Sequence, residues 1–488
     1  MSAHMNANLS ASFCVALLLL GGCTLTPSTT CERGGAQDGS CCPPWSFVEQ
    51  GRCAPRRWTS QLQDDGLGED ASHPSIDIDR TNRVWLAYED AYASGSDIYL
   101  AKEDGAGWSL SVPSAGLGEF NSEPRVSAVD DATSVLVWNR SGAATELQNH
   151  VRVGVSGGAM IEPPGGGRFS FSPYAYQNEA YANSDGELFL TWNQGLDFGM
   201  RRGICVATRH EGKPAFERPK NQLDVLSRSF IFSNNPEVAR NTRGDAVVTW
   251  YESIGEKLRV LPSERYGLGG PFTIAHDEDA LSPPDGDVEN PEPAVAEDGS
   301  AAIVWRQVLP TGKMAVFLAE RPYRGVWSRP TIDAPFSGVS DNAWNTRVAF
   351  APTGDLYVAW EEKNGDDWAV MLAHREPSGR WLASGTAALR LSSHPAIEPV
   401  LRVAADGTVV VVWRARFGTR WRVMARRSAV DAEGLREVDR WLPAEALSDE
   451  DADAGAPTLA VSRDATARGH RFAAAWSQDG HIHVATLD

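Results

Sequence analysis

Polar residues recur at two fixed distances from a series of regularly spaced aromatic residues. Each aromatic residue closes a short apolar run, and the series is Tyr88, Trp138, Trp192, Trp250, Trp305, Trp360, Trp413 and Trp476. Fifteen positions before the first seven of them stand His73, Glu123, Gln177, Asn235, Asn290, Asn345 and Glu398. Within two positions after them come polar side chains that include Asn139, Arg140, Asn193, Glu252, Arg306, Glu361 and Arg414. Amides, carboxylates and guanidinium groups repeated in this way can hydrogen-bond a glycan, hold a cation or dock a protein loop.

Two explanations fit these polar columns. Strand ends meet water in any β protein and need polar residues there for solvation alone. The functional alternative is a ligand-binding rim, because equivalent residues of successive repeats would be arranged around one axis. We predict that this rim consists of Glu123, Asn235, Asn290, Asn345 and Glu398 together with the residues given above that follow the aromatic positions. Three tryptophans outside the repeat columns are further candidates for stacking on a ligand, namely Trp344, Trp368 and Trp421.

The elements that would position these residues are strands in a repeat array. The closing aromatic residues are spaced by 50 to 63 residues, which is typical of propellers and similar arrays. Runs such as SVLVW and VVVVW are apolar without alternation and rich in β-branched residues, as in strands buried on both faces. With one strand before each run and two after it, a unit holds the four strands of a propeller blade.

Eight such units predict an all-β, eight-bladed β-propeller rather than a seven-bladed one. The chain ends in HIHVATLD without an outer strand, whereas Trp58 to Leu62 forms an isolated strand before the first unit. We therefore predict that this strand completes the eighth blade and removes its free edge. The propeller would span residues 58–488.

The repeat pattern resembles sialidase-like, BNR-type propellers. That resemblance implies the fold, and an activity only if three arginines, a tyrosine nucleophile with a glutamate partner, and an aspartic acid converge. The sequence holds no Phe/Tyr-Arg-Ile-Pro segment, and in Asp104-Gly105-Ala106-Gly107-Trp108 the aspartate stands one residue too near the tryptophan for an Asp-box turn. We therefore predict a binding or protein-interaction scaffold, with a sialidase-like glycoside hydrolase as the alternative.

Charge and length exclude other classes. The 488 residues carry 64 acidic and 45 basic side chains, a formal charge of −19, and no basic run, so a nucleic acid partner is not expected. A chain this long exceeds what one core supports, which again favours an array of small cores. We expect a monomer without a cofactor.

The first residues predict export and a lipid anchor. Phe13 to Leu20 is apolar and far too short to cross a bilayer as a helix, as in a signal peptide. The following LGGC resembles the lipobox of bacterial lipoproteins, which implies cleavage after residues 1–22 and lipidation of Cys23, with residues 23–30 as a tether. Thr24 in place of aspartate implies the outer membrane of a Gram-negative bacterium rather than its inner membrane. An ordinary secretory signal is the alternative.

Four cysteines crowd into residues 31–57, a segment too small to hold a core of its own. They are Cys31, Cys41, Cys42 and Cys53. In an oxidising compartment, two disulfides are expected to stabilise this segment. A zinc site of four thiolates is the alternative. Cys205 stands alone in an apolar segment and is expected to be a buried thiol.

The acidic connections between strands are a candidate for a calcium site. The aspartates of SDEDADAG, Asp449, Asp451 and Asp453, imitate the start of an EF-hand, but Gly455 comes one residue late and Ala460 stands where glutamate is required. An EF-hand is therefore excluded, and a looser Ca²⁺ site competes with the simple explanation of solvated charge.

The lipid anchor can be tested directly. We expect wild-type protein to incorporate labelled palmitate and to fractionate with membranes, because the thiol of Cys23 receives the lipid. Cys23→Ser should abolish the label and either release the protein or leave the precursor uncut. Absence of label in the wild type would refute the anchor.

Overall fold

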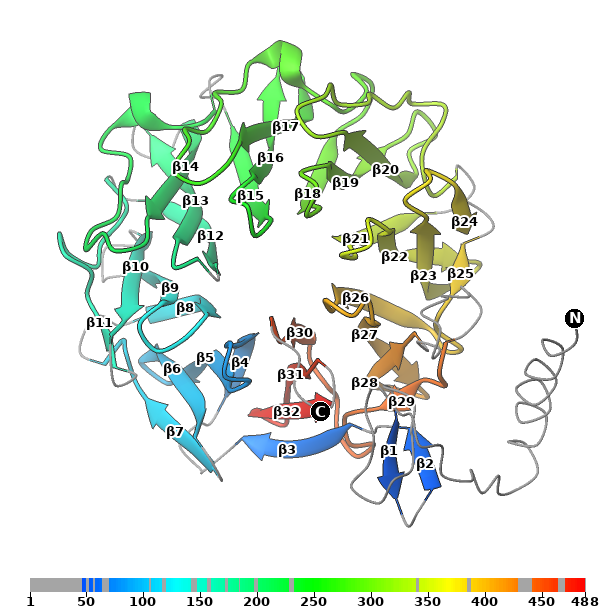
Figure 1. The fold of residues 1–488 in the computed structure, drawn as a ribbon. Coiled ribbons are helices and arrows are strands. Elements are labelled where there is room, and N and C mark those ends of the chain that lie inside the picture. The colour runs from blue at the N-terminus through cyan, green and yellow to red at the C-terminus, as the bar shows by residue number, and fades with distance from the viewer. Residues whose placement is uncertain are drawn as a thin grey trace, which may run out of the picture.

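Short antiparallel sheets follow one another along the chain and stand side by side around a central axis (Figure 1). The structure is a computed structural model that describes residues 46–49, 52–55, 58–63, 70–104, 107–115, 120–141, 147–155, 159–171, 174–183, 185–196, 201–227, 232–338, 342–383, 388–428, 441–463 and 470–487. Within these residues there are eight sheets of three to five strands and one separate two-stranded hairpin. The fold is all-β with the arrangement of a β-propeller.

Every sheet repeats the same strand order from the axis outward. The innermost strands are β4 (Ala71–Ile78), β8 (Phe120–Ala128), β12 (Ala175–Ala182), β15 (Ser233–Arg240), β18 (Val288–Val295), β21 (Ala343–Phe350), β26 (Ala396–Val403) and β30 (Thr458–Val461). The second strands are β5 (Val84–Tyr92), β9 (Ser134–Ser141), β13 (Leu188–Leu196), β16 (Ala246–Ile254), β19 (Ala301–Val308), β22 (Leu356–Asn364), β27 (Val409–Phe417) and β31 (Phe472–Gln478). The third strands are β6 (Gly95–Asp104), β10 (Leu147–Gly154), β14 (Arg201–Arg209), β17 (Lys257–Arg265), β20 (Met314–Arg321), β23 (Asp367–Arg375), β28 (Arg420–Arg427) and β32 (His481–Leu487).

Outer strands are shorter and occur in only some of the sheets that the structure describes. They are β3 (Thr59–Gln63), β7 (Gly107–Ser111), β11 (Met160–Ile161), β24 (Trp381–Ala383), β25 (Leu389–Arg390) and β29 (Glu445–Ala446). The separate hairpin is β1 (Ser46–Glu49) with β2 (Arg52–Pro55), and two 3₁₀ turns are η2 (Gln222–Asp224) and η3 (Asp277–Asp279). No helix among the described residues is both long and apolar enough to traverse a bilayer.

The core lies between the sheets. Eight apolar clusters occupy the eight interfaces between neighbouring sheets in the described residues. One of them joins Val304 and Val316 of the β18–β20 sheet to Leu356, Val358 and Trp360 of the next sheet. This is why the second strands are apolar without alternation, since both of their faces are buried.

The last sheet packs against the first and takes its outer strand from the other end of the chain. One cluster joins Ile482 and Val484 to Ile78 and Leu86, and β30 contacts β4. The strand predicted from Trp58 to Leu62 appears as β3, which pairs antiparallel with β32, with Thr59 opposite Thr486. In Figure 1, β3 runs alongside β32, the blue and red ends of the chain. The predicted pairing is confirmed.

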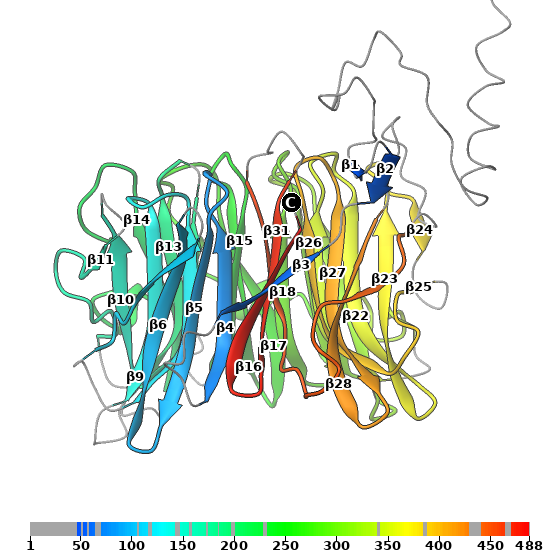
Figure 2. The same cartoon turned by 90° about the horizontal axis from the view of Figure 1, so that it is seen from below.

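The antiparallel pairing defines two faces of the ring. Innermost strands begin where second strands end, as Ala71 opposite Asp90 illustrates. The hairpins between second and third strands turn at the same end, which lies at the lower edge of the side view (Figure 2). We call this end the hairpin face, and the other end the opposite face.

The closing tryptophans share a hydrogen bond that the repeat pattern did not reveal. In five sheets the indole Nε1 donates to the side-chain oxygen of the residue two positions later, at distances of 2.8 to 3.2 Å. The pairs are Trp192 with Gln194, Trp250 with Glu252, Trp305 with Gln307, Trp360 with Glu362 and Trp476 with Gln478. A buried donor left unpaired costs about 1–3 kcal/mol, so in these five sheets the polar residue two positions after the tryptophan is required by packing. Trp138 Nε1 donates instead to Asn121 Oδ1, at 2.9 Å.

Trp413 is the exception. It is 1% exposed, but the residue two positions later is Ala415, and its Nε1 has no hydrogen-bond partner among the described residues. The β26–β29 sheet therefore buries an unsatisfied donor that its neighbours satisfy.

The predicted amino-terminal features lie outside the described residues. These are the signal peptide, Cys23, Cys31, Cys41 and Cys42. Cys53 falls in β2 opposite Val48, and its side chain is not described. Cys205 is a free, buried thiol, as its apolar segment predicts, and burial raises its pKa.

Supplying the missing acceptor should stabilise the protein. We expect Ala415→Gln to raise the free energy of unfolding by about 1 kcal/mol, because the new amide oxygen pairs with Trp413 Nε1. Chemical denaturation of both proteins measures the change. Ala415→Met adds a side chain of similar length without a strong acceptor and should give no gain. Equal gains from both substitutions would mean that filled volume, not the hydrogen bond, is responsible.

Candidate functional site

All seven residues of the first polar column adopt a left-handed backbone conformation. Their φ angles lie between 47° and 57°. Each sits in a register shift between an innermost strand and its second strand, such as the shift between Ser122 and Arg125. The column is thus a β-bulge repeated near the start of seven strands in the described residues.

The bulge supplies a physical reason for polarity that the sequence analysis did not consider. Asn and other short polar residues tolerate positive φ better than apolar or β-branched residues, and three of the seven residues are Asn235, Asn290 and Asn345. Backbone conformation therefore selects polar residues here even without a ligand. Their side-chain contacts decide what else they do.

Several bulge residues are joined into one network across neighbouring sheets. Gln177 Nε2 donates to Asn235 Oδ1 at 3.0 Å, and Asn235 Nδ2 lies 3.5 Å from Asn290 Oδ1. Glu123 accepts a hydrogen bond from Asn139 Nδ2 at 2.9 Å. These bonds join Gln177, Asn235 and Asn290 of three neighbouring sheets, and they tie Glu123 to the second strand of its own sheet. We call the bulge residues, together with the predicted residues that follow the closing aromatic positions, the rim.

Glu361 connects the next part of the rim. Its Oε2 accepts the backbone N–H of Glu398 at 2.7 Å, and its carboxylate also accepts a hydrogen bond from Asn345. Burial raises the pKa of Glu361, the neighbouring charge of Glu398 raises it further, and the hydrogen bonds and Arg306 oppose the rise. The carboxylates of Glu361 and Glu398 thus lie close to each other at the rim.

Arginines and tryptophans complete this side of the rim. The guanidinium of Arg306 forms an ion pair with Glu289 and lies 4.0 Å from the ring centroid of Trp344. Trp344 is 37% exposed and meets Trp368 edge-on at 6.2 Å. Trp344 is thus the exposed member of this group, with Trp368 at its edge and the buried guanidinium of Arg306, 8% exposed, against its ring, a cation–π contact of a kind that also occurs in ligand recognition.

A second arginine makes a smaller version of the same arrangement. Arg414 Nε lies 2.6 Å from Glu398 Oε2, and its guanidinium lies 5.3 Å from the ring centroid of Trp421. Of the three candidate tryptophans, Trp344 and Trp421 therefore contact rim arginines, and Trp368 contacts Trp344.

Other predicted rim residues are buried in the sheets. Glu252, only 1% exposed, accepts hydrogen bonds from Trp250 and Ser233. Asn193 is buried and donates to the carbonyl of Ser233 at 2.7 Å. Arg140 is half-buried, and its charge helps burial to lower the pKa of His150 to about 4. Glu252 and Asn193 therefore hold neighbouring strands together. Asn139, Arg306 and Glu361 are buried too, at 3%, 8% and 5% exposure, whereas Arg414 is half-buried.

A charged layer below the rim was missed by the sequence analysis. Two positions after each bulge residue the innermost strands carry Ser75, Arg125, Glu179, Glu237, Glu292, Arg347 and Val400. Arg125 Nε lies 3.0 Å from Glu179, and Arg347 lies 2.9 Å from Glu292. The run of charged residues at this single repeat position was the available signal. We call Arg125, Glu179, Glu237, Glu292 and Arg347 the charged layer.

Glu237 is the odd member of the charged layer. Within the described residues no hydrogen bond or ion pair involves its carboxylate. Burial raises its pKa well above the ordinary value, the charges of Glu179 and Glu292 raise it further, and Arg347 and Arg125 oppose the rise. The layer therefore contains two satisfied ion pairs and one uncompensated carboxyl group.

The far end of the channel is held by an arginine from the last sheet. Arg463 donates to Asp77 Oδ2 at 3.0 Å and to the carbonyls of Ile78 and Ala182 at 2.8 and 3.0 Å. It also donates to the carbonyl of Ala128. Innermost strands of three sheets are therefore tied to this one side chain.

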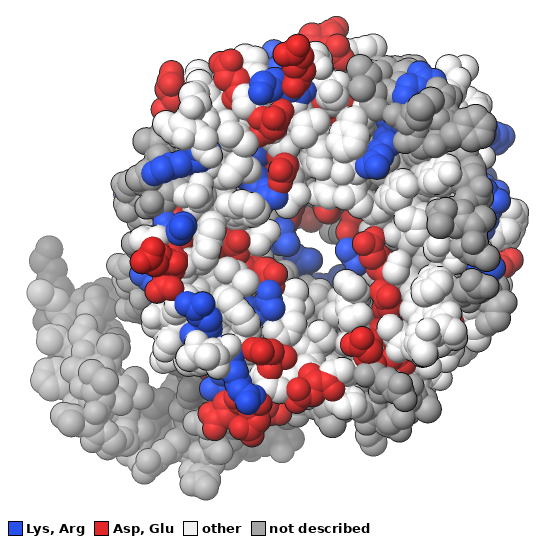
Figure 3. All heavy atoms as spheres, turned by 180° about the vertical axis from the view of Figure 1, so that it is seen from behind, with Lys and Arg blue, Asp and Glu red and all other residues white. Residues whose placement is uncertain are grey.

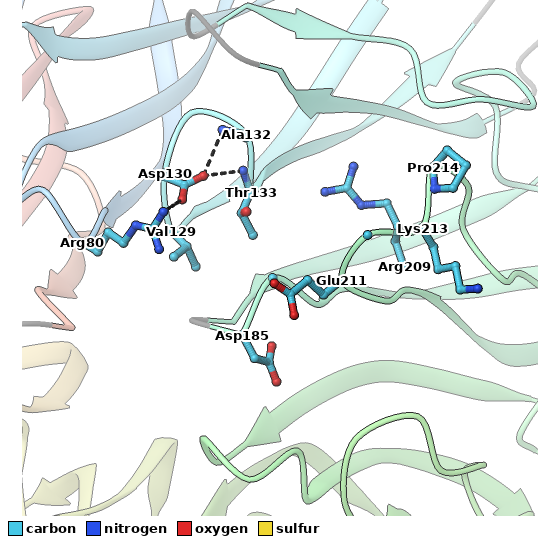
Figure 4. Close-up of a pocket in the computed structure, with 12 residues that line it drawn as sticks. Arg80, Val129, Asp130, Ala132, Thr133, Asp185, Arg209, Glu211, Lys213 and Pro214 are labelled. Carbon is cyan, nitrogen blue, oxygen red and sulfur yellow. Dashed lines mark hydrogen bonds and ion pairs between the residues drawn. The ribbon is translucent and has the colours of Figure 1, made fainter.

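The opposite face carries a pocket of about 410 Å³ between the turns of three sheets. Arg80 forms an ion pair with Asp130, which also accepts the N–H groups of Ala132 and Thr133 at 2.9 and 2.7 Å (Figure 4). Arg80 and Asp130 are thus already paired with other groups of the protein, so we assign this pocket no ligand.

The acidic segment considered for calcium lines a second cavity, of about 560 Å³, on the hairpin face. Gln478 Nε2 donates to the carbonyls of Asp449 and Ala452, and Asp453 accepts the backbone N–H of Trp421 at 2.7 Å. Across the part of the chain that the structure describes, no three His, Cys, Asp or Glu side chains are placed together to hold a metal ion.

Comparisons with known proteins give structural likeness only. No protein-family profile matches the chain, and no curated protein matches its sequence. A Dyadobacter fermentans protein of unknown function is 13% identical, covers 88% of this chain and 97% of its own, and has a TM-score of 0.41. The microbial sialidase Hz136 is 11% identical over 88% of this chain and 95% of its own, with a TM-score of 0.39. A PL25 ulvan lyase is 10% identical over 88% and 95%, with a TM-score of 0.47. Such values say nothing about activity.

The uncompensated carboxyl group predicts a pH-dependent stability. Because the pKa of Glu237 is higher in the folded than in the unfolded chain, its ionisation opposes folding. The penalty is absent below the ordinary pKa of 4.5 and grows as pH rises from there toward the folded pKa. We therefore expect Glu237→Gln to raise the melting temperature at pH 8 and to leave it unchanged near pH 4.

The matched control is Glu211→Gln, which removes one negative charge from an exposed residue on the opposite face. It reports the effect of net charge alone. Thermal unfolding followed at several pH values compares the two variants. A Glu237→Gln protein less stable than the wild type at pH 8 would contradict the assignment.

Proposed function

We propose that this chain is an exported, lipid-anchored, closed eight-bladed β-propeller that binds a carbohydrate at the rim on its hairpin face. The observation that carries the proposal is the Trp344 platform. An exposed indole with the Arg306 guanidinium 4.0 Å from its ring offers an apolar face for a sugar ring and donors for its hydroxyl groups at the same place.

The surroundings of the platform support a polar ligand with many hydroxyl groups. Asn345 follows Trp344 directly, and Glu361 lies opposite Trp344 across the paired strands. Amide, carboxylate and guanidinium groups therefore surround one exposed aromatic face. This mixture provides both donors and acceptors, which a sugar requires, since each hydroxyl group donates and accepts.

The ion pairs argue against recognition of a strongly acidic sugar by a triad of free arginines. Arg306 is paired with Glu289 and Arg414 with Glu398 at the rim. In the charged layer, Arg125 and Arg347 are paired as well. Each of these guanidinium groups already has a carboxylate, so a substrate carboxylate would have to displace it.

The eight-bladed ring and its anchor are part of the proposal. The eight apolar interfaces and the pairing of β3 with β32 support closure. The LGGC segment supports lipidation of Cys23, which would attach the protein to the cell envelope, with the outer membrane of a Gram-negative bacterium as the proposed location. The propeller would then act as a monomeric binding scaffold close to the bilayer.

A glycan array with the full-length protein in detergent identifies the ligand, and Trp344→Ala tests the site. We expect this variant to lose roughly tenfold in affinity, about 1.4 kcal/mol, because truncating an aromatic anchor removes its stacking surface. Asn345→Ala should weaken binding less, with stability unchanged.

Tyr323→Ala is the control for Trp344→Ala. Tyr323 is 42% exposed and follows β20, on the opposite face, so its loss should leave affinity unchanged. Equal affinity of wild type and Trp344→Ala for every bound glycan would refute the rim as the site. Release of reducing sugar by the wild type, lost in Glu361→Gln, would favour the alternative of a glycoside hydrolase with Glu361 as its acid.

A further inference from the structure

The residue directly before the bulge is aromatic in two of the seven sheets with a described bulge. Trp344 precedes Asn345, and Tyr176 precedes Gln177. In the other five sheets this position holds Ser72, Ser122, Asn234, Glu289 and Ile397. Because equivalent positions of a repeat are equivalent in space, Tyr176 stands at the hairpin-face end of its sheet as Trp344 does.

A second repeat position makes the likeness closer. Arg202 on β14 and Trp368 on β23 both lie opposite the third residue after the closing tryptophan of their own sheet. Trp368 meets Trp344 edge-on at 6.2 Å. The Arg202 guanidinium lies 5.1 Å from the ring centroid of Tyr176. Both sheets thus place a planar side chain against the aromatic residue that precedes the bulge.

The group around Tyr176 extends to the next sheet. The Arg202 guanidinium lies 4.9 Å from the ring centroid of Phe232, which precedes β15. Phe232 in turn meets the ring of Tyr251 at 6.3 Å, and Asn234 Nδ2 donates to the Tyr251 hydroxyl at 2.9 Å. All of these side chains are only half-buried. We call Tyr176, Arg202, Phe232 and Tyr251 the second platform.

The arginine of the second platform keeps its donors available. Arg306 and Arg414 each hold a carboxylate, whereas no carboxylate among the described residues pairs with Arg202. Its guanidinium contacts two aromatic rings instead, and its N–H groups can donate to the hydroxyl oxygens of a ligand. The second platform therefore combines an aromatic face with donors, as the Trp344 platform does.

Polar residues of the rim lie between the two platforms. The second platform belongs to the sheets of β12 and β15, and one further sheet, that of β18, separates it from Trp344 on β21. Gln177, Asn235 and Asn290 form a row of side-chain contacts across the first three of these sheets. Packed sheets are about 10 Å apart, so the platforms are separated by about 20–30 Å along the ring.

The face between the platforms does not carry one sign of charge. Figure 3 looks onto the hairpin face, from behind the view of Figure 1, and shows a hollow centre bordered by both acidic and basic side chains. A ligand that follows the rim passes beside this hollow and meets groups of both charges.

We infer that the ligand is a polysaccharide chain of several sugar units that rests on both platforms at once. The inference rests on the proposed carbohydrate-binding function. A single sugar ring cannot contact two platforms at this separation, whereas a chain can stack on Trp344 and Tyr176 and offer its intervening hydroxyl groups to Asn235 and Asn290. The second contact is then intramolecular, which raises affinity.

Oligosaccharides of graded length test the inference. The probes are the oligomers of two to eight units from cellulose, xylan, mannan and chitin. The full-length wild type should bind the eight-unit member of at least one series at least tenfold more tightly than the two-unit member, because only the longer chain reaches both platforms. Titration calorimetry measures the affinities.

Tyr176→Ala separates the inference from the proposed function. This variant should bind the eight-unit oligomer about tenfold more weakly than the wild type and the two-unit oligomer nearly as well, because the short chain binds at Trp344. Trp344→Ala should weaken both. Arg202→Gln leaves every aromatic ring in place and should also reduce the gain with length, so the test does not depend on the folding of one variant.

Tyr92→Ala is the matched control. Tyr92 is 46% exposed and lies at the β5–β6 hairpin of the same face, away from both platforms, so its loss should leave the gain with length unchanged. Equal affinity at every length in the wild type, or a gain that persists in both Tyr176→Ala and Arg202→Gln, overturns the second platform but leaves binding at Trp344 intact. Failure of all four series to bind also overturns it, and the array with Trp344→Ala then decides whether the rim binds other sugars or none.

Discussion

Burial of apolar faces between neighbouring sheets decides where every polar residue of this protein can stand. A sheet of three or four short strands cannot bury both of its faces alone, so each must be covered by its neighbours. The eight apolar clusters show the solution, including the one that packs the last sheet on the first. Once the second strands are buried on both sides, polar groups remain only at strand ends and along the central channel. Both the rim and the charged layer follow from that constraint.

The buried indoles impose a second requirement. A tryptophan that fills an interface also brings an N–H group that must be paired. Five sheets meet this need with an acceptor two positions later, and the β26–β29 sheet does not. Polar residues after the tryptophans thus divide into two kinds. Gln307 belongs to packing, whereas Arg306, one position earlier, faces the rim.

The channel contains several arginines although the molecule as a whole is acidic. The chain carries a net charge of −19, yet Arg125, Arg347 and Arg463 converge on the axis. Carboxylates from several innermost strands meet there, and arginines relieve most of their repulsion. For Glu237, burial together with its two acidic neighbours raises the pKa, and Arg347 and Arg125 only partly oppose the rise.

Sequence alone determined the strand order, the repeat and the pairing of the amino-terminal strand. These features depend on local patterns: apolar runs closed by Trp138 or Trp360, and a strand at Trp58 to Leu62 without a partner nearby. The same patterns selected Glu361 as a rim residue, because equivalent positions of a repeat are equivalent in space, whereas Trp344 was selected because it lies outside the repeat columns.

Tertiary structure alone decided what each polar residue does. Glu252 and Glu361 look alike in sequence, but one accepts an indole hydrogen bond inside a sheet and the other joins Asn345 to Glu398. The left-handed φ at the bulges depends on how each innermost strand pairs with the second strand of its own sheet. The proximity of Glu179, Glu237 and Glu292 depends on strands from different repeats lying against one another. Contacts between residues more than 50 positions apart are not encoded in any local pattern, because they arise only when the ring brings the innermost strands together.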